Sequence, residues 1–477
     1  MNQQHSWSQY RSDADLICAR VAALIRDHGV MVRYLGRPLL GYSSAQLIAL
    51  VARTVPVEQE PVSIPRLSGI VEALWQLRDE GLVPCRLDVG QLSNTLGTDQ
   101  QMVDQLRALP GLLDPQSSGA QPKLRPVVLF GFGRIGRIMA RLLMERHGPG
   151  SPLELSAIVL RPAKIDNDLE KRASLLERDS VHGPFDGQVE VDRDNQCLVI
   201  NGHAVKIIYA NAPEDIDYSA YGLRDPLIVD NTGAFKDREG LGRHLGGTGA
   251  RQVLLTAPAK GDIANVVYGI NDQTVGPDTA ISSAASCTTN AAAPVLAVMD
   301  QQFGVVSGHL ETIHAFTNDQ NLIDNFHKAD RRGRAAPLNL VITSTGAAKA
   351  VAKVLPALDG KLTGNAIRVP TPNVSLVILN LELARAGSVE EVNRVLLQES
   401  RNGAYAKQIG FTNEPEVVSS DFVGTRTTSI IDAQATLAQR NKVVLYIWYD
   451  NEFGYTHQVL RLAAKLSGQD LPSLPQI

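Results

Sequence analysis

Residues 283–290 read SAASCTTN, which places one of the chain's four cysteines, Cys287, among hydroxyl side chains. A structural cysteine behaves as a small hydrophobe, whereas a reactive one needs surroundings that favour its thiolate. His314, in the segment ETIHAFT, stands at the centre of a later strand-like run. A neighbouring imidazole lowers the pKa of a thiol and accepts a substrate proton. The two residues therefore predict a nucleophile and its base, with a satisfied core histidine as the alternative for His314.

Polar residues in the second half of the chain are suited to binding phosphate oxygens. Hydroxyls, backbone amides and a guanidinium are the donors that a phosphate dianion accepts from. The candidates are Ser286, Thr288, Thr317, Thr345, Gly346 and Arg368. The alternative, for each serine or threonine taken singly, is a turn or cap residue, which is the more common role.

The segment GFGRIG (131–136) matches the glycine fingerprint of dinucleotide-binding sites. It directly follows the apolar run PVVLFG and opens a segment with helical spacing. Gly131 permits a tight turn, Gly133 lets a pyrophosphate approach the backbone, and Gly136 allows close packing of helix on strand. The alternative is a glycine-rich turn that binds nothing. The strand, turn and helix context favours a cofactor site.

The acidic residue that normally follows the second strand of such a site is absent. The strand expected at 154–160 (ELSAIVL) is followed by Arg161, with Lys164 three residues on. An aspartate or glutamate there accepts the hydroxyls of the adenosine ribose, whereas an arginine accommodates a 2′-phosphate. The sequence therefore favours NADP over NAD as cofactor. The alternative is a solvent-facing arginine without a ligand.

The apolar spacing changes twice along the chain. From 13 to 109 it is helical, and Thr98 with Gln101 has the form of a capping box. Residues 110–126 are rich in proline, serine and glycine, as in a linker. From 126 onward short β-branched runs alternate with helical segments, which is typical of a doubly wound parallel sheet. Beyond Cys287 the longer runs, such as 308–317, 366–383 and 442–451, indicate a mainly antiparallel domain.

These patterns predict an α/β protein whose domain boundaries can be placed by residue number. An all-helical N-terminal extension is expected at 1–123 and a Rossmann-type dinucleotide-binding domain at 124–286. An α+β catalytic domain with an antiparallel sheet is expected at 287–455. The C-terminal helix, 456–477, is expected to pack back on the Rossmann domain.

Composition limits the classes of partner. The chain has 477 residues, 44% of them hydrophobic, and a net charge of -4, which gives no reason to expect nucleic acid or an acidic membrane as a partner. The four cysteines are widely spaced and form no metal-ligand grouping with histidines, so no metal is expected. The polar N-terminus does not resemble a signal peptide, and no run of about 18 apolar residues occurs. A soluble cytoplasmic protein is therefore expected.

Six segments, in this order, resemble phosphorylating glyceraldehyde-3-phosphate dehydrogenase. They are GFGRIGR, SAASCTTN, IHAFT, STGAAKAV, KLTGNAIRVPTPNVS and WYDNEFGY, and the resemblance covers roughly residues 126 to 466. It implies Cys287 as nucleophile and His314 as base. Ser286, Thr288, Thr345 and Gly346 would bind inorganic phosphate, and Thr317 and Arg368 the phosphate of the substrate. The residues implied for the cofactor are Gly131, Gly133, Arg134, Ile135, Gly136, Thr256 and Asn451, to which the strand-end position adds Arg161.

The resemblance also implies a reaction and an assembly. Glyceraldehyde 3-phosphate and inorganic phosphate would give 1,3-bisphosphoglycerate through a thioacyl intermediate, reversibly, and with NADPH in the gluconeogenic direction. Members of the family are homotetramers in which a loop, here about 318–341, lines the cofactor site of a neighbour. Position 291 is Ala where the family often has a second cysteine, and the first 125 residues have no counterpart in the ordinary enzyme.

Two alternatives remain. Erythrose-4-phosphate dehydrogenase, in which water resolves the thioester, shares the segment NDQ, but the intact STG at 344–346 keeps the attacking-phosphate site and argues against it. The second is a non-metabolic binding or redox-sensing module on the same fold. An intact set of catalytic residues argues against that role.

Overall fold

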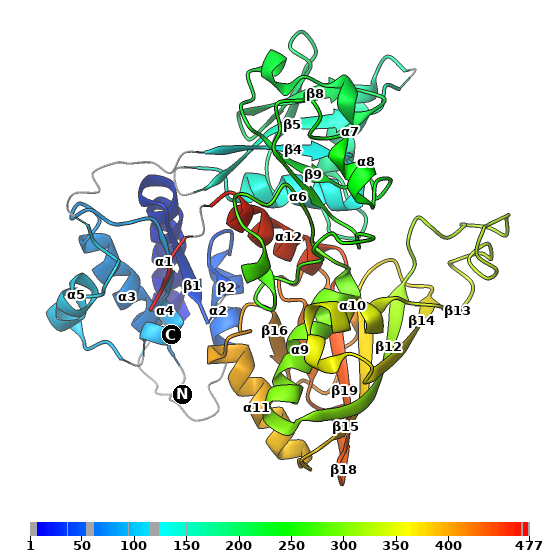
Figure 1. The fold of residues 1–477 in the computed structure, drawn as a ribbon. Coiled ribbons are helices and arrows are strands. Elements are labelled where there is room, and N and C mark those ends of the chain that lie inside the picture. The colour runs from blue at the N-terminus through cyan, green and yellow to red at the C-terminus, as the bar shows by residue number, and fades with distance from the viewer. Residues whose placement is uncertain are drawn as a thin grey trace. The chain divides into compact units, whose positions relative to one another are not determined.

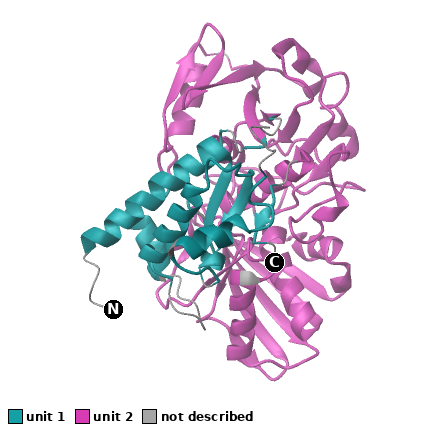
Figure 2. Ribbon diagram, turned by 90° about the vertical axis from the view of Figure 1, so that its left-hand side faces the viewer, with its two compact units in different colours: residues 1–124, 145–152, 469–477 teal, residues 125–144, 153–468 magenta. Residues whose placement is uncertain are grey.

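The computed structural model describes residues 7–35, 37–53, 62–93, 95–114, 124–148, 151–163, 165–468 and 471–475. The chain forms two compact units (Figure 2). The first contains 1–124, 145–152 and 469–477, and the second contains 125–144 and 153–468. The three-domain division expected from the sequence stays a prediction, because compactness separates only these two units.

The N-terminal unit combines helices with a small sheet (Figure 1). Its helices are α1 (Trp7–His28), α2 (Ser44–Arg53), α3 (Ile64–Gln76), α4 (Val89–Leu92) and α5 (Asp99–Arg107). Its strands, in the order β2-β1-β3-β20, are β1 (Val30–Tyr34), β2 (Arg37–Pro38), β3 (Cys85–Asp88) and β20 (Ser473–Leu474). β1, β3 and β20 are parallel and β2 is antiparallel to β1. The helices are as expected, but the prediction of an all-helical region is corrected by this sheet.

The missed strands have a physical explanation. All five residues of β1 are buried, and a short apolar run buried on both faces cannot be distinguished from a helix segment by its spacing. β20 lies almost 400 residues after β3 in the sequence, so no local pattern predicts that the two strands pair. Leu474 is 2% exposed and belongs to the same apolar core as Leu87. The C-terminal tail thus completes the N-terminal unit.

Helix boundaries follow local capping chemistry only in part. α1 ends before Gly29, whose φ of 70° is a left-handed conformation that glycine adopts without strain. α3 is capped by Ser63, whose hydroxyl accepts the backbone N–H of Arg66 at 3.3 Å. Thr98 is the N-cap of α5 but its side chain makes no capping hydrogen bond, so the expected capping box is wrong. Most of the expected linker, 115–123, lies outside the described residues.

The first sheet of the second unit has the order β11-β10-β9-β4-β5-β8-β7-β6. Its strands are β4 (Arg125–Phe130), β5 (Leu153–Leu160), β6 (Val189–Asp192), β7 (Cys197–Ile200), β8 (His203–Tyr209), β9 (Leu227–Asp230), β10 (Gln252–Leu255) and β11 (Ile281–Ser283). The strands from β11 to β8 are parallel, and β7 and β6 form an antiparallel edge. Helices α6 (Arg134–Glu145), α7 (Asp168–Glu177), α8 (Arg238–Gly242) and α12 (Phe453–Leu466) accompany it. Val459 and Leu462 of α12 share a core with Val127 and Leu129 of β4.

The second sheet has the order β13-β14-β12-β15-β19-β17-β16, with β18 beside β19. Its strands are β12 (Val305–Ala315), β13 (Val341–Thr343), β14 (Leu362–Val369), β15 (Ser375–Leu383), β16 (Ile409–Thr412), β17 (Ser429–Asp432), β18 (Leu437–Gln439) and β19 (Lys442–Tyr449). α9 (Cys287–Phe303), α10 (Ala347–Val354) and α11 (Val389–Asn402) share its apolar core. Most neighbours are antiparallel, but β12 with β14 and β16 with β17 are parallel. The predicted fold class, a Rossmann-type domain with an α+β catalytic domain, is confirmed.

Smaller features complete the description. Short 3₁₀ helices lie at Pro213–Asp215, Tyr218–Tyr221, Asp272–Thr274, Pro356–Leu358 and Ser419–Phe422. The run 366–383 forms two strands, because the prolines at 370 and 372 cannot donate to a sheet ladder. Among the helices that the structure describes, none is both long enough and apolar enough to cross a membrane.

The burial of Leu474 predicts that the C-terminal tail stabilises the N-terminal unit. Leu474→Ala should lower the free energy of unfolding of that unit by about 2–5 kcal/mol, the usual effect of truncating a fully buried leucine. Hydrogen exchange followed by mass spectrometry should then show faster exchange in β1 and β3. Ser473→Ala, at the half-buried neighbouring position, is the matched control. Unchanged exchange in β3 of the Leu474 variant would contradict the role given to β20.

Candidate active site

Cys287 is the first residue of α9, immediately after the turn that leaves β11. Ser286 caps the helix, since its hydroxyl accepts the backbone N–H of Thr289 at 3.0 Å. Ala285 has a φ of 56°, a strained value for a residue with a Cβ, and its carbonyl accepts the Tyr455 hydroxyl at 3.0 Å. The turn thus holds a partly exposed thiol at a helix N-terminus, where backbone amides favour negative charge.

His314 reaches the thiol from β12. Its Nε2 lies 3.5 Å from the Cys287 Sγ, within hydrogen-bond reach for sulfur. β12 and β14 pair in parallel with His314 opposite Arg368. The Arg368 Nη1 lies 2.6 Å from the His314 Nδ1 and donates to the Ala315 carbonyl at 2.9 Å. The structure therefore brings together the thiol, the imidazole and the guanidinium that the sequence singled out.

The electrostatics of this group favour a neutral resting state. Burial raises the pKa of the Cys287 thiol, and the positive charge of Arg368 offsets only part of that effect. Burial, followed by the charge of Arg368, lowers the pKa of His314 to about 3. Both shifts favour the neutral forms of the thiol and the imidazole. The lowering of the thiol pKa expected from the sequence stays a prediction.

A buried hydroxyl network supports the strand side of the site. The Tyr449 hydroxyl lies 3.0 Å from the Thr288 Oγ1 and 2.8 Å from the Thr312 Oγ1. Sequence reasoning missed Tyr449, although it stands in the quoted segment WYDNEFGY, two residues before Asn451. Ser375 donates its hydroxyl to the Asn451 Oδ1 at 2.8 Å, which fixes the orientation of that amide.

The other predicted phosphate ligands have local partners. The Thr345 hydroxyl accepts the Ala347 backbone N–H at 3.1 Å, and Gly346 is the N-cap of α10. The Thr317 carbonyl accepts the Gln320 backbone N–H at 2.9 Å. Arg332, which sequence reasoning missed, binds the Asp319 carboxylate at 2.5 Å, and its charge also lowers the pKa of His314. Its position in a long loop gave no spacing signal.

The glycine loop between β4 and α6 fits a dinucleotide. A Cβ on Gly131 would lie 2.8 Å from the Thr232 Cγ2, and one on Gly136 would lie 2.4 Å from the Gly131 carbonyl oxygen. Both positions therefore require glycine. A Cβ on Gly133 would meet nothing within 4 Å, so this residue borders open space at the N-terminus of a helix. Open backbone at a helix N-terminus is the surface that a pyrophosphate needs.

The side chain of Arg134, the first residue of α6, forms ion pairs with two carboxylates. The Arg134 Nη2 lies 2.6 Å from the Glu452 Oε2, and its Nη1 lies 3.2 Å from the Asp179 Oδ2. The His182 Nε2 lies 3.0 Å from the same Glu452 oxygen. Because the guanidinium already binds two carboxylates, the contact of Arg134 with a pyrophosphate that the sequence predicts would involve its backbone. Sequence reasoning missed Glu452 and Asp179, since neither lies near the glycine fingerprint.

The remaining predicted cofactor residues are well separated along the chain. Ile135 packs against the apolar core of the Rossmann sheet. Thr256 follows β10, and its hydroxyl donates to the Asp230 carbonyl at 3.0 Å. Arg161 follows β5 and is exposed, and Lys164 lies outside the described residues. β4, β5 and β10 run in the same direction, so their carboxyl ends share one edge of the sheet.

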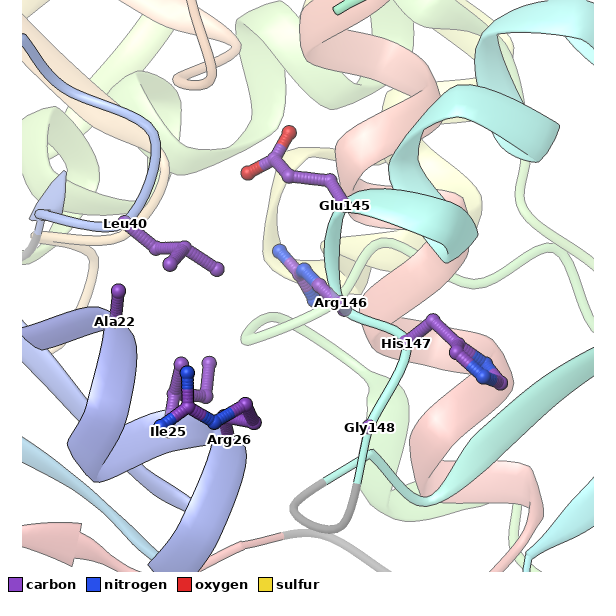
Figure 3. Close-up of a pocket in the computed structure, with 8 residues that line it drawn as sticks. All are labelled: Ala22, Ile25, Arg26, Leu40, Glu145, Arg146, His147 and Gly148. Atoms are coloured by element: carbon purple, nitrogen blue, oxygen red, sulfur yellow. The ribbon is translucent and has the colours of Figure 1, made fainter. Parts of the chain in front are cut away.

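In the described parts of the chain, no group of three or more histidine, cysteine, aspartate or glutamate side chains is arranged to hold a metal ion. The N-terminal unit has a pocket of about 170 Å³, in which Ala22, Ile25 and Arg26 face the turn 145–148 (Figure 3). The Arg26 guanidinium is bound to Asp27 at 2.7 Å. None of the predicted site residues lines this pocket.

Comparisons with known proteins identify the family. Residues 125–238 match the family model described as glyceraldehyde 3-phosphate dehydrogenase, NAD binding domain, and residues 286–451 match that of the C-terminal domain. A glyceraldehyde-3-phosphate dehydrogenase-like protein of Pseudomonas aeruginosa is 48% identical over 461 residues, which is 96% of this chain and 99% of that one. The chain belongs to the glyceraldehyde-3-phosphate dehydrogenase family. The resemblance predicted from six segments is thereby confirmed.

Two further relatives match a smaller share of this chain than the Pseudomonas protein does. The chloroplastic glyceraldehyde-3-phosphate dehydrogenase A of Zea mays is 43% identical over 353 residues, covering 73% of this chain and 84% of that one. The glyceraldehyde-3-phosphate dehydrogenase of Zymomonas mobilis is 40% identical over 346 residues, covering 72% of this chain and 98% of that one. More than a quarter of this chain therefore lies outside the alignment with the Zymomonas protein. The alignment with the Pseudomonas protein covers almost the whole chain. Membership supports a nicotinamide dinucleotide at the glycine loop.

The raised thiol pKa predicts how alkylation of Cys287 depends on pH. The thiolate is the reactive form, so the rate with iodoacetamide should still be rising at about pH 9, beyond the ordinary thiol range. Rates can be followed by mass spectrometry of the peptide that contains Cys287. The same peptide from protein unfolded in urea is the control and should titrate as an ordinary thiol. A plateau at neutral pH in the folded protein would contradict the neutral resting pair.

Proposed function

We propose that the chain oxidises D-glyceraldehyde 3-phosphate to 1,3-bisphosphoglycerate, with inorganic phosphate and a nicotinamide dinucleotide as co-substrates. The observation that carries the proposal is the 3.5 Å contact between the Cys287 Sγ and the His314 Nε2, with Arg368 beside them. A thiol, a base and a guanidinium in contact are what covalent chemistry on a phosphorylated aldehyde requires. Membership of the family supports this activity.

The chain's own residues supply the acylation step. The Cys287 sulfur forms a bond to the aldehyde carbon as the C=O π bond opens, and the thiol proton passes through His314 to the aldehyde oxygen, giving a thiohemiacetal. The amides at the start of α9 stabilise the developing oxyanion. His314 accepts the hydroxyl proton as the thiohemiacetal becomes a thioester. A nicotinamide dinucleotide held at the glycine loop and at Asn451 would accept the hydride lost from that carbon.

Phosphate binding completes the cycle. Arg368 and Thr317 hold the phosphate of the substrate, and Ser286, Thr288, Thr345 and Gly346 hold inorganic phosphate. The inorganic phosphate attacks the thioester carbon, the Cys287 sulfur leaves as thiolate, and the acyl phosphate is released. Support for the attacking-phosphate site comes from α10, whose N-terminus directly follows Thr345 and Gly346. The same feature disfavours the erythrose-type reaction, in which water resolves the thioester.

The loop after β12 supports assembly into the homotetramer that is typical of the family. Between 320 and 342 it exposes large apolar side chains, among them Leu322 at 75%, Phe326 at 90% and Leu338 at 81%. Exposed apolar clusters of this kind mark protein interaction sites. We infer that a second copy of the chain covers them.

Inorganic phosphate dependence tests the reaction. Steady oxidation of glyceraldehyde 3-phosphate should require phosphate or arsenate, and Cys287→Ser should lower the rate by more than about a thousandfold, because a hydroxyl is a far poorer nucleophile at neutral pH. Formation of reduced cofactor measures both. Binding of the cofactor to the variant, followed by fluorescence, should be nearly unchanged. Equal turnover in phosphate-free buffer would replace this proposal with the erythrose-type reaction, and activity of the variant within tenfold of the wild type would refute the role of Cys287.

Arg161 is the proposed determinant of NADP preference. It is exposed at the carboxyl end of β5, and among the described residues it has no hydrogen-bond or ion-pair partner, so its guanidinium is free for a 2′-phosphate. A preference for NADP(H) supports a physiological role in the gluconeogenic direction, in which 1,3-bisphosphoglycerate is reduced.

A charge-assisted contact at Arg161, worth about 1.5–3 kcal/mol, should favour NADP(H) by roughly 10- to 150-fold. Arg161→Asp should therefore shift the preference toward NAD(H), mostly through KM, because the new carboxylate repels the 2′-phosphate and accepts ribose hydroxyls. The ratio of kcat/KM for the two cofactors measures the shift. A wild-type preference for NAD, with an unchanged ratio in the variant, would show that Arg161 takes no part.

A further inference from the structure

A histidine and an aspartate form a fully buried pair at the carboxyl edge of the Rossmann sheet. Asp230 is the last residue of β9, and His244 lies two residues after the end of α8. Neither side chain is exposed, and the His244 Nε2 lies 3.1 Å from the Asp230 Oδ2. A carboxylate oxygen accepts hydrogen bonds, so Nε2 is the donor of this one. A buried carboxylate is unfavourable unless it is paired, so His244 stabilises Asp230 in this position.

The other oxygen of Asp230 holds the turn that follows β9. Its Oδ1 accepts the backbone N–H of Thr232 at 2.7 Å and the Thr232 hydroxyl at 2.6 Å. The same hydroxyl oxygen accepts the backbone N–H of Ala234 at 3.1 Å. The carboxylate therefore links His244 on one side to the conformation of residues 231–234 on the other.

This turn lies against the glycine loop. A Cβ on Gly131 would lie 2.8 Å from the Thr232 Cγ2, so the threonine methyl group packs directly on that glycine. The Asn231 side-chain amide donates to the Gly131 carbonyl at 3.5 Å, and the Asn231 backbone N–H donates to the Phe130 carbonyl at 2.9 Å. β4 and β9 are parallel neighbours, with Phe130 opposite Asp230. The end of β9 and the glycine loop therefore form one continuous surface.

The strand order reverses between β4 and β9. From β4 the chain continues to β5 and β8 on one side, whereas β9, β10 and β11 lie on the other side. In doubly wound sheets a ligand binds in the crevice at such a reversal, outside the carboxyl ends of the strands. The glycine loop after β4 borders that crevice on one side, and the turn after β9 borders it on the other. The position of residues 231–234 therefore affects how well a dinucleotide fits.

We propose that the His244–Asp230 pair holds the 231–234 turn against the glycine loop and thereby raises the affinity for the dinucleotide. The inference rests on the proposed function in one respect, which is the binding of a nicotinamide dinucleotide at the glycine loop. His244 is buried and acts through Asp230 and Thr232. It is therefore a positioning residue for the cofactor site.

The surroundings of His244 make its contact with Asp230 the main polar interaction of the ring. The imidazole makes T-shaped contacts with the rings of Phe130 and Phe235, whose centroids lie 4.6 Å and 5.7 Å away. Its Nδ1 has no hydrogen-bond partner among the described residues. Without the ring, the Asp230 Oδ2 would lose its donor in an apolar site, which is strongly unfavourable. Asp230 would then turn toward water and draw the exposed Thr232 away from the glycine loop.

The dissociation constant of the reduced cofactor, measured by fluorescence without any aldehyde, tests the inference separately from turnover. His244→Leu removes the donor and keeps a buried apolar side chain. It should raise the dissociation constant by about tenfold or more, the scale of one hydrogen bond to a charged group. His244→Gln, whose amide can still donate to Asp230, should stay within about threefold of the wild type.

Tyr218→Phe is the matched control. Tyr218 is buried, and burial together with the charge of Asp230 raises the pKa of its hydroxyl. That hydroxyl has no hydrogen-bond partner among the described residues, so it does not hold the turn. The control removes a buried polar atom near the carboxylate and should leave the dissociation constant unchanged.

Steady-state kinetics distinguish positioning from a general loss of structure. In His244→Leu the KM for the dinucleotide should rise together with its dissociation constant. The kcat at saturating cofactor and the KM for glyceraldehyde 3-phosphate should stay within about twofold, because only cofactor binding is weakened. Hydrogen exchange followed by mass spectrometry should be faster in the peptide that contains 231–234 and unchanged in β12 and β14. A loss of kcat without a change in the affinity for the cofactor overturns the inference.

Thr232→Val gives a second test if His244→Leu does not fold. Thr232 is exposed, and valine keeps a methyl group for Gly131 while it removes the hydroxyl between Asp230 and Ala234. The dissociation constant should rise by about threefold or more, the scale of one neutral hydrogen bond. Thr232→Ser, which keeps the hydroxyl, should stay closer to the wild type.

The outcomes separate the inference from the function on which it rests. Unchanged affinity for the cofactor in a folded His244→Leu variant, or in Thr232→Val, overturns the inference and leaves the function standing. A wild type that binds the cofactor but does not oxidise glyceraldehyde 3-phosphate refutes the proposed function and leaves the inference standing. A wild type that binds neither NAD(H) nor NADP(H) overturns both.

Discussion

The parallel pairing of β12 with β14 is the constraint on which the candidate site depends. It sets His314 opposite Arg368, and α9, which begins with Cys287, packs against β12 from the same apolar core. Side chains alternate between the faces of a strand, so a slip of one residue in β12 would turn His314 to the other face. Ile313 or Ala315 would then stand opposite the guanidinium. The buried residues of α9 and β15 specify the register and thereby the chemistry.

Burial has two opposing effects on the site. It keeps the thiol and the imidazole neutral, which costs reactivity, and it also removes water, which strengthens every interaction of a charge with its partners. The Arg134 guanidinium, at the glycine loop, stays charged, and the carboxylates of Glu452 and Asp179 form ion pairs with it. The glycine loop thus carries paired charges, whereas on the thiol side the Arg368 guanidinium donates to the Ala315 carbonyl, beside titratable groups whose pKa shifts favour their neutral forms.

Features that are encoded within one short segment could be recognised from the sequence. The glycine fingerprint, the thiol among hydroxyls and the histidine in its strand each stand within a short segment, and the structure brings the last two into contact. Arg332 and Glu452 could not be found in this way, because their partners lie far along the chain. The contact of Arg368 with Nδ1 was also out of reach, since it depends on a strand register that no single segment encodes. In the N-terminal unit, α1 and α3 followed their apolar stripes, whereas the sheet needed a strand from the other terminus.

The position of β20 has a consequence for how the protein is made. Leu474, which belongs to the core of the N-terminal unit, is synthesised long after Leu112 of the same core. At about 5–20 residues per second, the interval between synthesis of Leu112 and of Leu474 is roughly 20 to 70 seconds. During that time the N-terminal helices lack strand β20, while the ribosome synthesises the Rossmann-type domain and the catalytic domain. A chain whose synthesis stops before Leu474 would therefore carry an incomplete N-terminal core.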